Sequence, residues 1–335
     1  MHRLPDQARV SLFGRILTML AMTVGVGITL LGALSFIPGI WFFDQLSQFR
    51  LVYILCLSIC ALILGALRAL RAVAVCLILL ILTTIPVAVM FIPNKCSATE
   101  NSSASTENRI SVLTFNTEFQ HNDNYKSFDE IVTASKADVI AIVEINQTWV
   151  DALAATLKPY PFRKFVNQGA GIALFSKYPI VSTTITPFGK SHHPRMVAEL
   201  QMKSRKINVI VAHPTTPKSI SGFAERNSEI TLLANEIEAL EGPKIFIGDL
   251  NCGPWSSEFS KLLNAGLIDS EQGFGPQPSW PARKGRVLKS LSIPPIVPID
   301  HVLVSREFCV VSRQAGPSIG SDHLPVIVRL RLDNL

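Results

Sequence analysis

Hydrophobic residues dominate the first 92 positions of the chain. Between residues 16 and 92 the formal charges are Asp44, Arg50, Arg68 and Arg71. Three stretches, 16–37, 51–67 and 72–92, are apolar and about the length that a helix of roughly 20 residues needs to cross a bilayer. A buried helical hairpin or a signal peptide is the alternative, but three consecutive stretches without a small-residue cleavage site disfavour the signal peptide. We therefore expect residues 1–93 to form a membrane anchor with three transmembrane helices.

From residue 110 onward, the apolar runs have the length of strands. Residues 110–116 alternate apolar and polar positions, and residues 138–144 form a continuous apolar run, typical of a strand covered on both faces. Further strands are expected at 171–179, 195–200, 207–213, 244–251, 299–305 and 324–332. Helical spacing of apolar residues predicts helices at about 126–136, 223–240 and 256–265.

Polar side chains occur where many of these strands end. They are Asn116, Glu118, Glu144, His213, Asp249, Asn251, Asp300, Asp322 and His323. Each of these residues, considered alone, could have a purely structural role, such as an Asx turn, a helix cap or an ordinary surface histidine. No local rule makes so many apolar runs end in this way. Convergent carboxylate and amide oxygens suit a hard cation such as Mg²⁺, and the absence of paired cysteines or zinc-spaced histidines argues against zinc.

The segment Gly248-Asp-Leu-Asn251 carries the sharpest of these signals. Asp249 and Asn251 are two residues apart, so at the end of a strand their side chains leave on the same side. A carboxylate and a carboxamide placed in this way can hold a water molecule and a phosphate oxygen about a hydrogen bond apart.

The charge distribution separates the two parts of the chain. Residues 1–96 carry seven Lys/Arg and two Asp/Glu, whereas the rest carries 24 and 23. The pI of about 9.1 therefore reflects the anchor and does not indicate a nucleic-acid surface. Residues 94–109 read as a polar linker, and residues 110–335 have the length of one domain. The loop 270–298, which contains Arg283, Lys284, Arg286 and Lys289, is either a rim facing the substrate or a solvated insertion.

Six short blocks together resemble the endonuclease/exonuclease/phosphatase family, the fold group of DNase I-like nucleases, neutral sphingomyelinases and inositol polyphosphate 5-phosphatases. They are Thr114-Phe-Asn116, Val143-Glu144, Val211-Ala-His213, Gly248-Asp-Leu-Asn251, Ile299-Asp-His301 and Ser321-Asp-His323, in the order in which the family has them. The resemblance implies an α/β fold, a four-layer sandwich of two central sheets flanked by helices. The anchor in front resembles a membrane-tethered bacterial branch of the family.

The resemblance also implies roles for the polar residues. Glu144 would be the main metal ligand, with Asn116 and Asp322 helping. Glu118, which stands where some relatives have Asp, would be a further metal ligand. Asp249 would orient or deprotonate the attacking water, and Asn251 would hold a phosphate oxygen.

The two histidines would contact the phosphate. His213 and His323 would stabilise its developing charge, with Asp300 fixing the ring of His323. Whether Asp249 or His323 takes the proton stays open, and Mg²⁺ or Mn²⁺ is the implied cofactor.

Three hypotheses of function follow from these observations. The first is a membrane-tethered, Mg²⁺-dependent phosphoesterase acting on a phosphodiester or phosphomonoester, with a lipid-linked substrate favoured over DNA or RNA. A metal-dependent nuclease is its alternative. The second is a catalytically inactive, membrane-anchored binding domain, which the complete ligand set disfavours. The third is a transporter, for which the membrane charges are too few and too peripheral.

Charge in the short loops predicts the orientation of the chain in a bacterial inner membrane. Arg3, Arg9 and Arg15 precede the first span, and Arg68 and Arg71 lie between the second and third spans. Positive loops stay in the cytoplasm, so residues 110–335 should lie on the extracytoplasmic side. We expect protease added to spheroplasts to digest this domain. If the domain is protected, the orientation is wrong and the short middle span does not cross.

Overall fold

The computed structural model describes residues 12–35, 37–93, 108–282 and 294–333, and it divides into two units, residues 1–88 and 89–335. The first unit contains the helices α1 (Leu12–Leu34), α2 (Trp41–Ser47), α3 (Arg50–Ala66) and α4 (Leu70–Ala88). Leu57, Leu64 and Cys76 are buried where α1, α3 and α4 pack together. Gly25 of α1 faces Leu57 of α3, and a Cβ atom there would lie at an ordinary contact distance of 3.6 Å.

Two helical segments of the described chain are long and apolar enough to cross a membrane, α1 and Leu70–Phe91. They correspond to the first and third predicted spans. The middle one, α3, has 17 residues and counts as a third span only if it is joined to α2, from which it is bent by 68°. The number of candidate spans is therefore two, or three with the bent pair.

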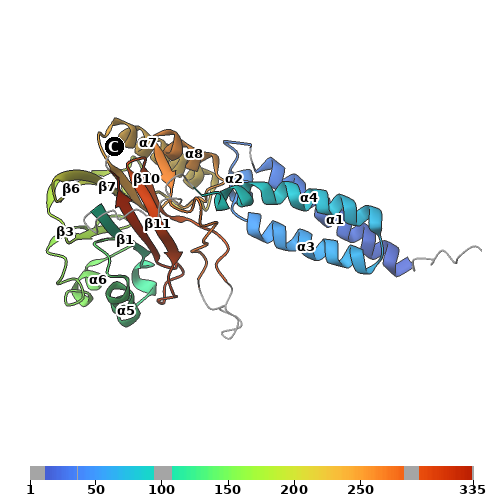
Figure 1. Ribbon diagram of the computed structural model, residues 1–335, viewed down its shortest axis with the longest axis horizontal. Helices are drawn as coiled ribbons and strands as arrows, with labels where there is room; N and C mark the ends of the chain where they lie inside the picture. Colours follow the sequence, from blue (N-terminus) through green and yellow to red (C-terminus); the bar gives the residue numbers. More distant parts are fainter. Residues whose placement is uncertain (1–11, 36, 94–107, 283–293, 334–335) are drawn as a thin grey trace, which may run out of the picture. The chain divides into compact units, whose positions relative to one another are not determined.

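Twelve strands of the second unit form two six-stranded sheets (Figure 1). The first sheet has the order β11-β12-β1-β2-β4-β3, and its strands are β11 (Phe308–Ala315), β12 (Val326–Leu332), β1 (Arg109–Asn116), β2 (Val139–Val143), β4 (Ile172–Ser176) and β3 (Phe162–Val166). The second has the order β5-β6-β7-β8-β10-β9, with β5 (Ile180–Pro187), β6 (Pro194–Met202), β7 (Arg205–Ala212), β8 (Lys244–Asp249), β10 (Asp300–Ser305) and β9 (Leu267–Asp269).

Helices cover the outer face of each sheet (Figure 1). The first sheet packs against α5 (Tyr125–Ser135) and α6 (Gln147–Ala152), and the second against α7 (Ile220–Ala239) and α8 (Ser257–Asn264). The expected four-layer sandwich is confirmed.

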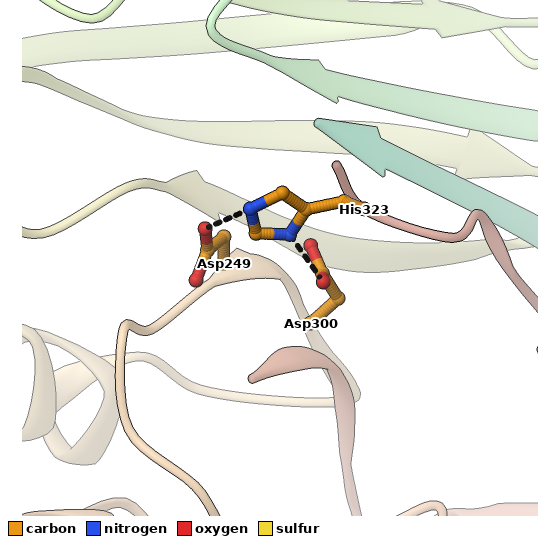
Figure 2. Close-up of side chains that lie close together, drawn as sticks. All are labelled: Asp249, Asp300 and His323. Carbon is orange, nitrogen blue, oxygen red and sulfur yellow. Dashed lines mark hydrogen bonds and ion pairs between the residues drawn. The ribbon is translucent and has the colours of Figure 1, made fainter. Parts of the chain in front are cut away.

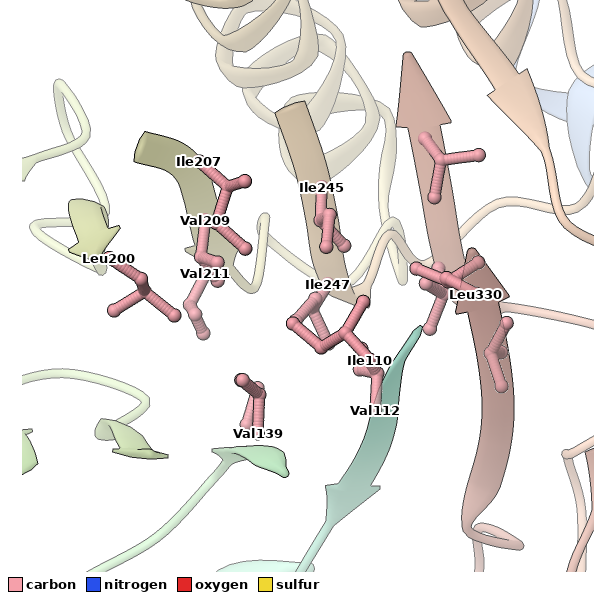
Figure 3. Close-up of a cluster of buried hydrophobic side chains, with 14 of the residues drawn as sticks. Ile110, Val112, Val139, Leu200, Ile207, Val209, Val211, Ile245, Ile247 and Leu330 are labelled. Atoms are coloured by element: carbon pink, nitrogen blue, oxygen red, sulfur yellow. The ribbon is translucent and has the colours of Figure 1, made fainter. Parts of the chain in front are cut away.

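The inner faces of the two sheets share one hydrophobic core (Figure 3). Ile110 and Val112 of β1 and Val139 of β2 meet Val209, Ile245 and Ile247 of the second sheet there. The alternate residues of β2, Ile140 and Ile142, instead pack under α5 and α6. Both faces of β2 are thus covered, which explains its continuous apolar sequence.

Strand direction places the ends of several strands at one edge. The parallel strands β1 and β2 end together, with Asn116 opposite Val143. In the second sheet, the end of β8 lies opposite the start of its antiparallel neighbour β10, so that Asp249 faces Asp300. This register brings together polar side chains that are distant in sequence.

Two expectations concern residues outside the described part of the chain: most of the polar linker and the basic cluster at 283–289. Cys252 and Cys309 are buried free thiols.

A buried ion pair supports the second sheet. Arg313 on β11 lies 3.0 Å from Glu271, both side chains are inaccessible to solvent, and its guanidinium also donates to the carbonyl oxygen of Asp300. Burial raises the pKa of Glu271, and the positive charge of Arg313 opposes this shift.

Replacing one partner of this pair tests its contribution. Arg313→Met leaves a buried carboxylate without its cation, so we expect the free energy of unfolding to fall by about 3–5 kcal/mol. Urea unfolding of the full chain in detergent, followed by tryptophan fluorescence, measures this. Arg329→Met, at an exposed position of the neighbouring strand, is the control and should change stability by less than about 0.5 kcal/mol. Equal effects of the two variants would contradict the assignment.

Candidate active site

Asn116, the last residue of β1, connects the two sheets at the shared edge. Its side chain is fully buried. Its Nδ2 donates to Glu144 Oε1 and to Asp249 Oδ2, each at 3.1 Å, and its Oδ1 accepts from the backbone N–H of Glu118. Asn116 therefore fixes a carboxylate from each sheet.

Glu144 and His213 face each other across the same edge. Glu144 follows β2, and His213 follows β7. The His213 Nε2 lies 3.1 Å from Glu144 Oε1, and its Nδ1 lies 3.1 Å from the carbonyl oxygen of Asp249. Because both ring nitrogens face acceptors, both donate, and the ring is held as an imidazolium.

Asp249, Asp300 and His323 form the centre of the site (Figure 2). Asp249 ends β8 and Asp300 begins β10. The Nδ1 of His323 lies 2.8 Å from Asp300 Oδ2, and its Nε2 lies 3.7 Å from Asp249 Oδ2. The imidazole thus stands between the two carboxylates (Figure 2), and all three side chains are buried.

Asn251 turns the chain after β8. It adopts a left-handed conformation with φ of +51°, which Asn tolerates better than most residues. Its backbone N–H donates to Asp249 Oδ1 at 2.8 Å, and its Nδ2 donates to the carbonyl oxygen of Pro214. The predicted pair Asp249 and Asn251 is therefore held together by an Asx turn.

Asp322 and Glu118 lie on the more open side of the site. Glu118 Oε2 accepts from the backbone N–H of Asp322 at 3.1 Å. Asp322 Oδ1 is 3.9 Å from His323 Nε2, and Oδ2 accepts from Trp280 Nε1 at 3.2 Å. The structure thus brings all nine predicted site residues together.

The electrostatics of the site are those of buried acids paired with cations. Burial alone would raise the pKa of Glu144, but the hydrogen bond and charge of His213 together with Asn116 outweigh it and lower the pKa to about 2. Burial would lower the pKa of His323, but Asp300 and Asp249 raise it to about 10. His213 is raised to about 9, against burial, by Asp249 and Glu144. Both histidines are therefore cations at neutral pH.

Asp249 behaves differently from the other acids. Burial, followed by the charge of Asp300, raises its pKa to about 6, while the two histidine cations oppose the shift. Burial acts in the same direction on Asp300, but the charge and hydrogen bond of His323 prevail and lower its pKa. Of the two opposed aspartates, Asp249 is the one that can accept a proton near neutral pH.

The chemistry of the donor atoms fits a hard cation. Glu144 Oε1 is held by Asn116 and His213, and Glu118 Oε2 accepts from the backbone N–H of Asp322, so the site offers three carboxylates with fixed neighbours. Mg²⁺ needs only one or two carboxylates because it retains several waters. Asp249, Asp300 and His323 also have ligand atoms within 4.8 Å of one another. We consider that group an ion-paired triad, because the two ring nitrogens already face separate carboxylates.

Supporting residues were missed at the sequence level. His193 stacks on His213 with ring centroids 6.2 Å apart and an angle of 5° between the planes. Ser279 Oγ accepts from the backbone N–H of Asp300, and Trp280 holds Asp322. These residues lie in loops that show no periodicity, so no local signal marks them.

Comparison with known proteins places this arrangement in context. The sequence matches the Endonuclease/Exonuclease/phosphatase family over residues 113–323. No curated protein matches it. The fold is similar to that of an endonuclease/exonuclease/phosphatase from Beutenbergia cavernae, with 19% identity, a TM-score of 0.53, and coverage of 68% of this chain and 72% of that one.

Two further solved structures show the same fold. Truncated TDP2 from Caenorhabditis elegans has 13% identity and a TM-score of 0.56, covering 67% of this chain and 97% of that one. A mannosyl-6-phosphatase from Bacteroides thetaiotaomicron has 14% identity and a TM-score of 0.53, covering 66% and 99%. The family match spans more than half of the chain and contains every predicted site residue, so the chain belongs to the endonuclease/exonuclease/phosphatase family of phosphoester hydrolases.

Proposed function

We propose that this protein is a membrane-tethered, Mg²⁺-dependent phosphoesterase that hydrolyses a phosphodiester or phosphomonoester. The observation that carries the proposal is the convergence of Asp249, the His323–Asp300 pair and the His213–Glu144 pair at one sheet edge. Displacement at phosphorus needs a positioned water, neutralised charge and a proton acceptor. These residues offer all three.

Within this proposal, Asp249 is the proton acceptor. His323 is already protonated at neutral pH and is held by Asp300, so it stabilises negative charge on the phosphoryl oxygens. Asp249 is ionised above about pH 6 and lies opposite it. His213 supplies a second cation, and Asn251 is placed to donate to a phosphate oxygen.

Glu144, with Asn116, Asp322 and Glu118 around it, would hold the metal. A bound Mg²⁺ or Mn²⁺ would polarise the phosphoryl group and neutralise charge that develops during hydrolysis. Oxygen donors also favour these ions over zinc or copper.

A lipid-linked substrate in the membrane remains our preferred choice within this chemistry. The catalytic domain is nearly neutral, which offers little affinity for a DNA backbone, and the chain carries two or three candidate membrane spans. We place the domain on the extracytoplasmic face of a bacterial inner membrane, on the loop charges given above. A nuclease is the second candidate, since a similar structure, TDP2 from D. rerio, is complexed with a single-strand DNA product.

Metal removal and site variants test the proposed chemistry. EDTA should abolish phosphoester hydrolysis, and Mg²⁺ or Mn²⁺ should restore it. Glu144→Ala, His213→Ala and Asp249→Asn should each lower kcat, the last by about 10²–10⁴-fold because a general base is lost. Exposed Asp151 on α6 provides the control Asp151→Asn, which should retain full turnover. Near-normal turnover of any site variant removes that residue from the assignment.

The stability of the metal-free protein should depend on pH through His323. Its pKa is raised from 6.5 to about 10 on folding, so its contribution is fully present below about pH 6.5 and is lost as the pH rises through 10. Between pH 7.5 and 9, the free energy of unfolding should fall more steeply in the wild type than in His323→Gln, by up to about 1.4 kcal/mol per pH unit. Urea titrations in EDTA measure both slopes, and parallel slopes would show that His323 is neutral in the folded state.

A further inference from the structure

The loop 270–282, between β9 and the site, forms one wall of the active site. The Oγ of Ser279 accepts from the backbone N–H of Asp300, and its carbonyl oxygen accepts from the N–H of Leu324. Trp280 donates to the side chain of Asp322, and the N–H of Ala282 donates to the carbonyl oxygen of Asp322 at 2.7 Å. The second half of the loop thus contacts residues on both sides of His323.

The first half of the same loop binds the segment Val89–Ile92, where the second unit begins. The N–H groups of Gly273 and Gly275 both donate to the carbonyl oxygen of Met90, at 2.8 and 3.1 Å. Gln272 Nε2 donates to the carbonyl oxygens of Val89 and Ile92, at 2.9 and 2.6 Å. Met90 is buried by this contact.

Gly275 makes the close approach possible. Its φ of +77° is unfavourable for other residues, and a Cβ atom there would lie 2.3 Å from the ring of Phe91. The loop conformation and the position of the Phe91 ring therefore depend on a glycine at this position.

The loop between these two contacts is rigidly supported. Glu271 pairs with buried Arg313 and accepts from the N–H of Gln277, and the side chains of Gln277 and Arg313 bond to each other. Arg313 also donates to the carbonyl oxygen of Asp300, whose side chain is hydrogen-bonded to His323. A segment bound to this loop is thus held at a fixed position relative to the site.

The bound segment leaves apolar side chains uncovered. Val89, Phe91 and Ile92 are 48%, 58% and 59% exposed. The bound segment begins directly after α4, which ends at Ala88. The stretch Leu70–Phe91, which includes both, is long and apolar enough to cross a membrane. These exposed apolar side chains therefore continue directly from a segment that can cross a bilayer.

We propose that the loop 270–282 and the bound segment Val89–Ile92 form a membrane-facing rim of the active site, which presents the site to phosphate esters in the lipid headgroup layer. The inference rests on the proposed phosphoesterase function and specifies its substrate class. A lipid-borne ester would meet the site at the high effective concentration of the membrane surface, whereas a soluble ester would not.

The test compares two substrates on full-length protein in nanodiscs with Mg²⁺. One is a phospholipid with a fluorogenic phosphodiester headgroup, incorporated into the nanodisc, and the other is soluble bis(p-nitrophenyl) phosphate. Gly275→Ala places a Cβ against Phe91 and should lower the ratio of lipid to soluble turnover by at least about tenfold. Gly266→Ala is the matched control, because Gly266 also has a positive φ, +92°, but a Cβ there meets nothing within 4 Å.

If Gly275→Ala does not fold, Gln272→Ala is the second variant. It removes the hydrogen bonds from Gln272 to Val89 and Ile92, and it should also lower the ratio of lipid to soluble turnover. An unchanged ratio in the folded variant would overturn the inference. Soluble turnover by the wild type without lipid turnover would also overturn it and leave the phosphoesterase function standing. A wild type that hydrolyses neither substrate would instead overturn the proposed function. Dimers that form through Val89–Ile92, detected by cross-linking, would show that a second copy covers these side chains, against the proposal.

Discussion

Two aspartates stand opposite each other on neighbouring antiparallel strands, and the rest of the site depends on how their charges are balanced. Asp249 and Asp300 are paired in register and are both buried. Two adjacent carboxylates cannot both remain ionised in a low-dielectric interior unless cations accompany them. His323 and His213 provide that compensation, and each must be delivered by a different part of the chain. The loop before β12 supplies one, and the end of β7 supplies the other.

The sandwich architecture makes this compensation possible. Asn116 and Glu144 come from the first sheet, whereas His213, Asp249 and Asp300 come from the second. Their hydrogen bonds cross the gap between sheets only where the apolar core ends. A wider or differently twisted packing of the two sheets would separate Asn116 from Asp249 and leave buried polar atoms without partners. The hydrophobic core therefore sets the geometry of the polar edge.

Much of this arrangement could be predicted from the sequence, because buried strands appear as continuous apolar runs. The continuous apolar run of β2 and the run that ends at Gly248 marked strands covered on both faces, and their terminal acids marked the site. Four other strands were not anticipated. The sequence of β5 shows little alternation of apolar and polar residues, as at Thr183 and Thr184, because the strand lies at a sheet edge and is largely exposed. The same applies to β3, while β9 has only three residues and the bulge in β11 disturbs its period.

The supporting contacts could not be predicted for a different reason. Trp280 and His193 act through tertiary contacts with residues about 42 and 20 positions away, and nothing in their local sequence identifies those partners. The charge state of Asp249 likewise depends on Asp300, 51 residues later. Such properties belong to the register between strands and not to any motif.

The backbone at the site has a further consequence. Glu118, Glu144 and Asn251 all adopt left-handed conformations, with φ of +59°, +55° and +51°. For non-glycine residues each such conformation costs on the order of 1 kcal/mol, which the surrounding contacts must offset. The edge that gathers these functional groups is thus also where the chain stores local strain. Glycine would adopt these conformations without strain but would supply no carboxylate or amide, so the chemistry of the site is obtained at some cost in stability.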